Sequence, residues 1–278
     1  MSELWEVLKQ ALKISGLVLV MMVLVDLFNV RTQGQLRTLI RGGIWRQYWG
    51  AALLGAIPGC LGSFAVVSLY VHGMLSFGAL VGCMVATCGD EALVMLSLFP
   101  RSALVLFGLL FIGGVALAWI ADRLVSLLKF QPCEECRLGE IHVGEKGARH
   151  YFLEHVWSHL LREHLWRVFL WTFFALAVAH WGVQIWNLEE VVRAHPGWML
   201  LLAALVGILP ESGPHLIFAT LFAQGLIPFS VLLTSSLVQD GHGLLPLLSY
   251  TWRDALLVKF FNFLFGLGTG LALYALGW

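Results

Sequence analysis

Residues 55–104, GAIPGCLGSFAVVSLYVHGMLSFGALVGCMVATCGDEALVMLSLFPRSAL, have a counterpart at residues 207–256, GILPESGPHLIFATLFAQGLIPFSVLLTSSLVQDGHGLLPLLSYTWRDAL. The two segments align without a gap at a shift of 207 − 55 = 152 residues. Because glycine and proline set backbone shape and helix ends, the duplicated unit contains breaks in helices as well as apolar sequence. The clearest matches pair Gly55 with Gly207, Pro58 with Pro210, Gly73 with Gly225, Gly89 with Gly241, and Arg101 with Arg253.

The composition indicates a membrane protein. Hydrophobic residues make up 59% of the 278 residues and charged residues only 12%, a balance that would not keep a soluble domain of this size in solution. Lysine plus arginine and aspartate plus glutamate are equal at 17 each, so the charge gives no sign of a nucleic-acid partner. We therefore expect an all-α polytopic membrane protein.

The duplication predicts the domain organisation. It extends back to residue 4, because Trp5 meets Trp157 at the same shift. We expect one membrane repeat at 1–121, a cytoplasmic linker containing cysteine and histidine at 122–155, and a second membrane repeat at 156–278. Residues 4–13 have the period of a short interfacial helix, and residues 14–30 form the first membrane crossing.

Charged residues in the connections predict an inverted pair of repeats. The connection 31–46 carries four arginines and the central segment 122–165 carries six lysines or arginines, so both are expected to be cytoplasmic. The counterpart of the first connection, 187–198, holds two glutamates and one arginine and is expected to be external. Equivalent connections would then lie on opposite sides of the membrane. This requires an odd number of crossings per half, so the two repeats have opposite orientations.

Two breaks recur in each half, and they divide apolar runs too short to span a membrane alone. Each run flanking the first break is about ten residues long, half of the roughly 20 that a span needs. Broken or re-entrant helices leave free backbone groups near mid-membrane, which is tolerable where they line a cavity or meet a ligand. The residues that make these breaks are Pro58, Gly59, Gly89, Pro210, Gly213 and Gly241.

Acidic residues in these breaks are the candidate transport site, because an uncompensated acid inside a membrane costs at least about 3 kcal/mol. The predicted ligands of a metal cation are Asp90, Glu91, Asp240 and His242, followed by Glu211, His215, Cys60 and Cys88. Structural explanations stay open: the acids can pair with Arg101 or Arg253, the histidines can be core residues, and the cysteines can be small buried apolar residues. Lys259 is expected to reach the interface or to pair with Asp254, and Asn262 is a weaker candidate.

The linker offers a separate possibility. Cys133 and Cys136 form a CxxC pattern with His142 downstream, which is compatible with an accessory site for zinc or another transition metal. A solvated polar linker without metal explains the same residues.

At the paired segments PGCLGSFAVVSLYVHGMLSFGALV…ATCGDEALVML and PESGPHLIFATLFAQGLIPFSVLL…QDGHGLLPLL, the chain resembles the bacterial manganese transporters, also described as ten-transmembrane heavy-metal exporters. The resemblance covers both repeats. It implies ten membrane segments and a metal cation as cargo. We expect the protein in the bacterial cytoplasmic (inner) membrane, as a multi-pass protein. The chain departs from the expected pattern at Glu211-Ser212 and at His242, which leaves a shift in metal preference open.

We expect a secondary transporter that exports a divalent cation, manganese or a softer heavy metal, in exchange for protons, because no GxxxxGK[ST] nucleotide-binding loop is present. The metal is then substrate and no cofactor is permanently bound. The expected partners are the metal ion and the lipid bilayer, and a homodimer is compatible with the sequence. Two alternatives stay open: a carrier of an organic or lipid-linked anion held by Arg101 or Arg253, and a phosphatase-like membrane enzyme using Glu211, Ser212 and His215.

Overall fold

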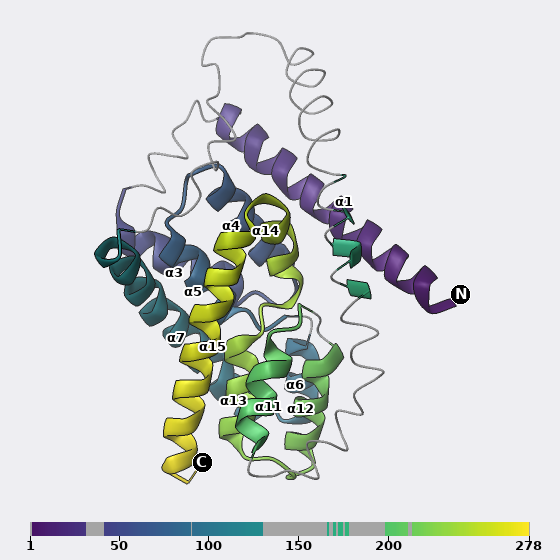
Figure 1. Ribbon diagram of the computed structural model, residues 1–278, viewed down its shortest axis with the longest axis vertical. Helices are drawn as coiled ribbons and strands as arrows, with labels where there is room; N and C mark the ends of the chain where they lie inside the picture. Colours follow the sequence, from purple (N-terminus) through teal and green to yellow (C-terminus); the bar gives the residue numbers. More distant parts are fainter. Residues whose placement is uncertain are drawn as a thin grey trace.

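The computed structural model describes residues 2–31, 42–89, 91–129, 198–210 and 213–277, with short pieces at 166, 169–170, 172–174 and 176–177. All regular elements in these ranges are helices (Figure 1), which confirms the expected all-α class. Asp90, Glu211, Ser212, most of the connection 31–46 and the residues from 130 to 165 lie outside them.

The described helices fall into two sets along the chain. The first set is α1 (Ser2–Arg31), α3 (Ile44–Gly55), α4 (Leu61–Val71), α5 (Phe77–Ala86), α6 (Ala92–Leu98) and α7 (Pro100–Leu127). The second set is α11 (Met199–Gly207), α12 (Gly213–Ala223), α13 (Phe229–Val238), the 3₁₀ turn η3 (Gly241–Gly243), α14 (Leu244–Tyr250) and α15 (Trp252–Ala275).

Helix bounds recur at the shift seen in the sequence. α4 and α12 begin 213 − 61 = 152 residues apart, α5 and α13 begin 229 − 77 = 152 apart, and α7 and α15 begin 252 − 100 = 152 apart. The left-handed glycines recur as well: φ is 66° at Gly73 and 71° at Gly225, and 61° at Gly89 and 51° at Gly241. The same backbone plan therefore occurs twice.

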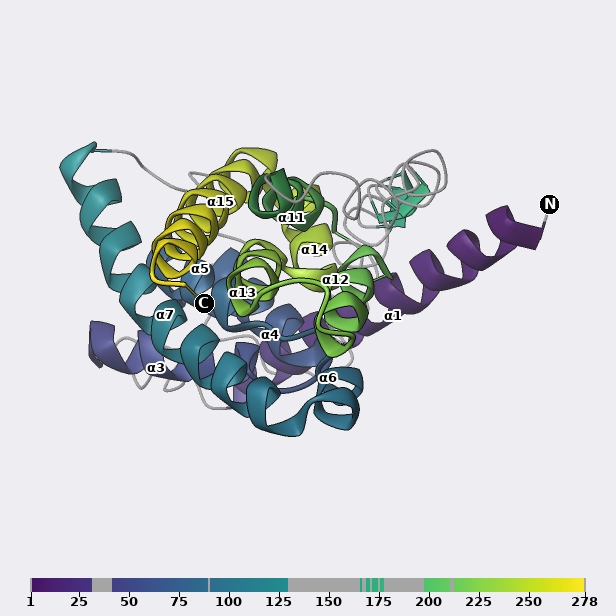
Figure 2. The same cartoon turned by 90° about the horizontal axis from the view of Figure 1, so that it is seen from below.

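Equivalent helices of the two sets occupy opposite ends of the molecule. In Figure 1, α6 lies low and its counterpart α14 lies high, while α15 runs down to the C-terminus and α7 runs upward and to the left from beside α6. The view from below (Figure 2) shows α7 running from one edge of the molecule to beside α6, and α15 lying next to α11.

Small residues let the central helices approach closely. A Cβ added at Gly82 of α5 would lie 2.6 Å from the carbonyl oxygen of Gly114 in α7. In the second set, a Cβ at Gly266 of α15 would lie 2.5 Å from Val238 Cγ2 of α13. Such contacts between small residues are typical of helix packing in membranes, where close backbone approach replaces the hydrophobic effect between helices.

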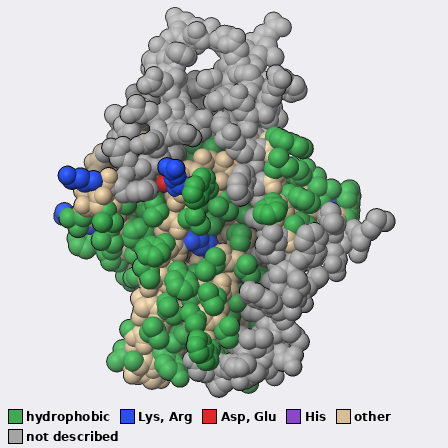
Figure 3. Space-filling view, in the orientation of Figure 1, with side chains coloured by type: hydrophobic (Ala, Val, Ile, Leu, Met, Phe, Trp, Pro, Cys, Tyr) green, Lys and Arg blue, Asp and Glu red, His purple; other side chains and the backbone are tan. Residues whose placement is uncertain are grey.

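Lengths and surface agree with a membrane-spanning fold. Of the described helices, Pro100–Leu127 and Trp252–Ala275 are long and apolar enough to cross a bilayer, whereas α4, α5 and α12 are apolar but only 10–11 residues long. Large hydrophobic side chains face outward: Leu104, Ile112 and Leu271 are more than half exposed. Figure 3 shows hydrophobic side chains over most of the described part of one face. The protein is therefore an all-α polytopic membrane protein.

Two details differ from the sequence analysis. Residues 2–31 form the single helix α1 in place of an interfacial segment followed by a separate crossing, because no glycine or proline signal falls between Lys13 and Ile14 to end the helix. In addition, α7 continues to Leu127, so the expected boundary between residues 121 and 122 falls inside a helix. Between residues 48 and 121, the described part of the chain forms the helices α3, α4, α5, α6 and α7.

Candidate functional site

The described helix breaks converge at the centre of the fold. The amide nitrogen of Gly59, in the first break, donates to the carbonyl oxygen of Gly89, in the second break, at 3.1 Å. A Cβ added at Gly241, in the equivalent break of the other half, would lie 3.9 Å from Gly89 Cα. The left-handed φ of Gly89 and Gly241 explains why glycine occupies both positions. Residues from both halves therefore meet at one place.

Glu91 joins the two halves through its side chain. It directly precedes α6 and is 1% exposed. Its Oε2 accepts a hydrogen bond of 3.4 Å from Nε2 of Gln239, which directly follows α13. The oxygen of the same amide, Gln239 Oε1, is buried and has no hydrogen-bond partner among the described residues. A buried carboxylate and a buried amide oxygen thus lie side by side.

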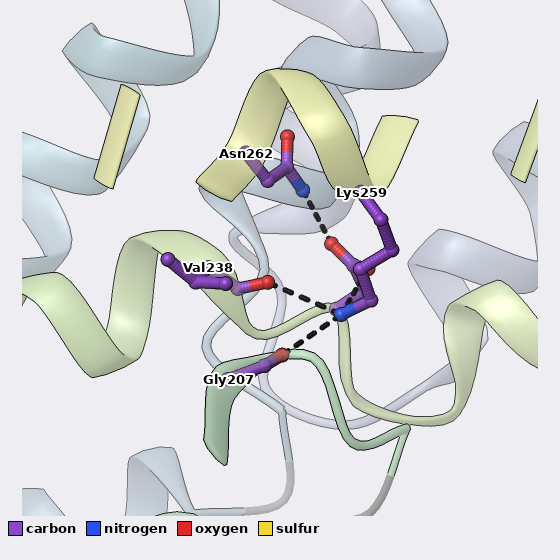
Figure 4. Close-up of polar contacts among 5 residues, drawn as sticks. Gly207, Val238, Lys259 and Asn262 are labelled. Atoms are coloured by element: carbon purple, nitrogen blue, oxygen red, sulfur yellow. Dashed lines mark hydrogen bonds and ion pairs between the residues drawn. The ribbon is translucent and has the colours of Figure 1, made fainter. Parts of the chain in front are cut away.

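Asp240 is fully buried and contacts two residues of α15 (Figure 4). Its Oδ2 lies 2.6 Å from the Nζ of Lys259, and its Oδ1 accepts a hydrogen bond from Asn262 Nδ2. Lys259 and Asn262 are three residues apart, so they share one face of the helix. Asn262 Oδ1 is a second buried amide oxygen without a partner in the described part of the chain.

His242 and Cys60 form a third contact between the halves. His242, in η3, is 6% exposed, and its Nδ1 lies 3.4 Å from the Sγ of the half-buried Cys60, which precedes α4. Its Nε2 lies 3.1 Å from Nε2 of Gln10 in α1. An imidazole beside a thiol is a pair of ligands that zinc and softer metals accept.

The remaining predicted ligands have other hydrogen-bond partners. His215, in α12, is buried, and its Nδ1 lies 3.0 Å from Ser235 Oγ of α13. The Cys88 thiol donates to the carbonyl oxygen of Ala86 at 3.7 Å. Neither hydrogen bond joins another predicted ligand. Glu91, Asp240, His242 and Cys60 thus make contacts between the halves or with α15, whereas Cys88, although it directly precedes Gly89 in the same break, and His215 have separate hydrogen bonds.

The described residues contain no group of three or more His, Cys, Asp or Glu side chains placed to hold a metal ion. Asp90 and Glu211, which sequence analysis placed in the same breaks, lie outside the described ranges, as do Cys133, Cys136 and His142. What the described part provides is two carboxylates, two unpaired amide oxygens, and one imidazole–thiol pair.

The ion pair of Lys259 differs from the pairings that the sequence left open. Lys259 pairs with Asp240, and Asp254 Oδ2 accepts a hydrogen bond from the Tyr70 hydroxyl at 2.6 Å. Arg253 does not pair with Asp240, because its guanidinium is exposed and lies 5.7 Å from the Trp252 ring centroid. Lys259 lies in the interior of α15 and its Nζ reaches the carbonyl oxygen of Val238 at 3.2 Å, whereas Arg253 lies in the first turn of that helix.

The exposure of the arginines also bears on the alternatives. Arg101 and Arg253 are both exposed, so neither guanidinium contributes to the buried group as an anion clamp. From the sequence, Asn262 was only a weaker candidate, Lys259 was expected at the interface or beside Asp254, and Gln239 was not among the candidates. The available signal was two polar residues, Lys259 and Asn262, one turn apart within the otherwise apolar run 255–268.

Comparison with known proteins gives a family for the chain. A family model with the description "Putative, 10TM heavy-metal exporter" matches residues 5–165 and 144–277. The searches of curated proteins and of solved structures found no match. Because the family model covers nearly the whole sequence, the chain belongs to this family of ten-transmembrane heavy-metal exporters.

Proposed function

We propose that the protein exports a divalent metal cation through the point where the helix breaks of the two halves meet. The observation that carries this proposal is the pair of buried carboxylates, Glu91 and Asp240, which come from different halves and flank the contact between Gly89 and Gly241. Buried acids at broken helices are typical of ion pathways in membranes. Membership of a heavy-metal exporter family supports the same cargo.

The chemistry of the donors favours manganese as the first candidate. The carboxylates of Glu91 and Asp240 and the amide oxygens of Gln239 and Asn262 are hard ligands, and one imidazole from His242 suits an ion of intermediate hardness. Participation of Cys60 would shift the preference toward zinc or cadmium. We include Asp90 and Glu211 in the proposed ligand set on the strength of their positions in the sequence.

The proposed mechanism is alternating access by two inverted repeats in the bacterial cytoplasmic membrane. Its support is the recurrence of helix bounds at 152 residues and the opposite placement of α6 and α14 in Figure 1. Carboxylate and imidazole ligands lose protons when they bind metal, so a proton gradient is the proposed driving force. Metal affinity should consequently fall as pH is lowered.

A binding and flux experiment on purified protein tests the proposal. Reconstituted wild-type protein should transport Mn²⁺, and Glu91→Gln should weaken Mn²⁺ binding more than about tenfold, since loss of even outer-sphere partners costs 10–100-fold at metal sites. Asp254→Asn is the matched control, because Asp254 is an equally buried carboxylate that contacts Tyr70 outside the breaks.

The two variants distinguish a carboxylate that binds metal from a buried carboxylate that only supports folding. Equal loss of binding in both variants would show that buried carboxylates support folding and not metal. Unchanged binding in Glu91→Gln would remove Glu91 from the site. No binding or transport of Mn²⁺, Zn²⁺ or Cd²⁺ by folded wild-type protein would overturn the proposed function.

A further inference from the structure

The ammonium group of Lys259 is surrounded by oxygens at the centre of the fold (Figure 4). Its Nζ lies 2.6 Å from Asp240 Oδ2 and donates to the carbonyl oxygens of Gly207 at 2.9 Å and Val238 at 3.2 Å. Lys259 is 7% exposed and Asp240 is fully buried. The positive charge is therefore held deep inside the protein by one carboxylate and two backbone carbonyls.

Those two carbonyls belong to the ends of half-length helices. Gly207 is the last residue of α11 and Val238 is the last residue of α13. Carbonyls at a helix C-terminus lack partners within the helix, and the helix dipole adds negative potential there. Together with Asp240, they make a set of oxygens that would attract a free cation if no lysine were present.

We propose that Lys259 is a tethered cation that occupies part of the transport site and competes with the metal for Asp240. Without cargo, the ammonium neutralises the carboxylate inside the membrane. A metal ion reaches Asp240 only when the ammonium moves away from it. This inference rests on the proposed function, because it takes Asp240 to be one of the groups that the cargo uses.

The role of Asn262 fits this exchange. Lys259 contacts Oδ2 of Asp240, whereas Asn262 donates to Oδ1. Departure of the ammonium would thus leave the carboxylate held in place by the amide, with one oxygen open. The buried Asn262 Oδ1, which has no partner among the described residues, lies on the same side chain that contacts Asp240.

The first half lacks the equivalent of this pair. At the shift of 152 residues, Cys88 stands where Asp240 is and Phe107 stands where Lys259 is. Among the described residues, a buried lysine thus occurs in the half that has the buried aspartate at this position and not in the other. A lysine that competes with metal for a carboxylate must occur together with that carboxylate, as Lys259 does with Asp240. A lysine that served only to cap the C-terminal ends of two helices would be expected in both halves.

Metal binding at one fixed pH tests the competition. With Mn²⁺ as the probe and purified full-length protein, Lys259→Met should bind about tenfold more tightly, as expected if Asp240 is open in about a tenth of wild-type molecules. Arg253→Gln, which removes an exposed cation from the same helix, should bind as wild type does. Lys259→Arg, which keeps a cation, should show no gain.

The outcomes separate this inference from the proposed function. Binding by wild-type protein with no tighter binding by folded Lys259→Met would overturn the tethered-cation role alone. Absence of Mn²⁺ binding in every folded variant would overturn the transport site itself and the inference with it. The double variant Asp240→Asn/Lys259→Met should not show the tighter Mn²⁺ binding of Lys259→Met, and this result would support competition at Asp240.

A second measurement avoids variants that fail to fold. The ammonium of Lys259 in wild-type protein should react slowly with a membrane-permeant amine-acylating reagent, because it is buried and paired. Saturating Mn²⁺ should increase acylation of Lys259 severalfold, measured by mass spectrometry, while the exposed Lys9 reacts equally with and without metal. Acylation of Lys259 that is unchanged or reduced by bound Mn²⁺ would contradict the inference.

Discussion

The second break of each half has the same backbone but different side chains. Gly89 and Gly241 both adopt left-handed φ after helices that end at equivalent positions, Ala86 and Val238. The residue that directly precedes this glycine differs between the halves. In the first half it is Cys88, whose thiol donates to the carbonyl oxygen of Ala86, and in the second half it is Asp240, which pairs with Lys259. Equivalent positions in the two halves therefore share the backbone conformation of the break but differ in charge.

The largest expected effect separates Asp240 from Cys88. Asp240→Asn leaves the buried Lys259 without its counter-charge, which should destabilise the protein by about 3–5 kcal/mol and abolish transport. Cys88→Ser, at the equivalent position of the first half, should retain most of the stability and most of the transport activity. Thermal unfolding in detergent and flux into vesicles measure the two effects, and equal losses in the two variants would contradict the asymmetry.

The double variant Asp240→Asn/Lys259→Met sharpens this comparison. Removal of both charges leaves no uncompensated ion, so most of the lost stability should return. Transport should stay absent, because the carboxylate is still missing. Recovery of transport in the double variant would show that Asp240 serves only to neutralise Lys259.

The amino-acid sequence was sufficient for the backbone plan and insufficient for the ion pairs. Glycine and proline restrict φ locally, so the breaks at Pro58-Gly59, Gly89 and Gly241 could be located by the repeat alone. The partner of Asp240 could not be predicted in this way. Lys259 lies 19 residues further along the chain, in α15, and the contact depends on how α15 packs. Cys60 and His242, 182 residues apart, were each predicted as ligands without any signal that they meet.

The next effect concerns the helix contacts that support both halves. Gly114→Ala would place a Cβ 2.5 Å from Gly82 O, and Gly266→Ala would place one 2.5 Å from Val238 Cγ2. Overpacking of this kind costs about 1–3 kcal/mol. Gly108→Ala and Gly268→Ala are the matched controls on α7 and α15, because a Cβ there meets no atom within 4 Å. Unfolding temperatures in detergent should fall for the first pair only.

The glycines at the convergent breaks should show a smaller and equal effect. Alanine in the left-handed conformation costs about 1–2 kcal/mol relative to glycine, and φ is 61° at Gly89 and 51° at Gly241. Among the described residues, a Cβ at Gly241 would have one neighbour, at 3.9 Å, so strain and not collision sets the cost there. Clearly unequal losses of unfolding stability in Gly89→Ala and Gly241→Ala would show that the strain of alanine differs between the two breaks.

The smallest effect should be a change in metal preference at the contact between Cys60 and His242. Because the thiol lies 3.4 Å from the imidazole Nδ1, Cys60→Ser replaces a soft donor by a hard one at nearly the same place. The affinity for Zn²⁺ and Cd²⁺ should fall severalfold, while the affinity for Mn²⁺, which prefers oxygen ligands, should change little. Cys83→Ser is the matched control, since Cys83 is a fully buried thiol of α5. Competition binding with the three metals measures the shift. Equal changes for all three metals would mean that Cys60 acts on the packing of η3 and not on the cargo, and the choice of metal would then rest on the oxygens around Glu91 and Asp240.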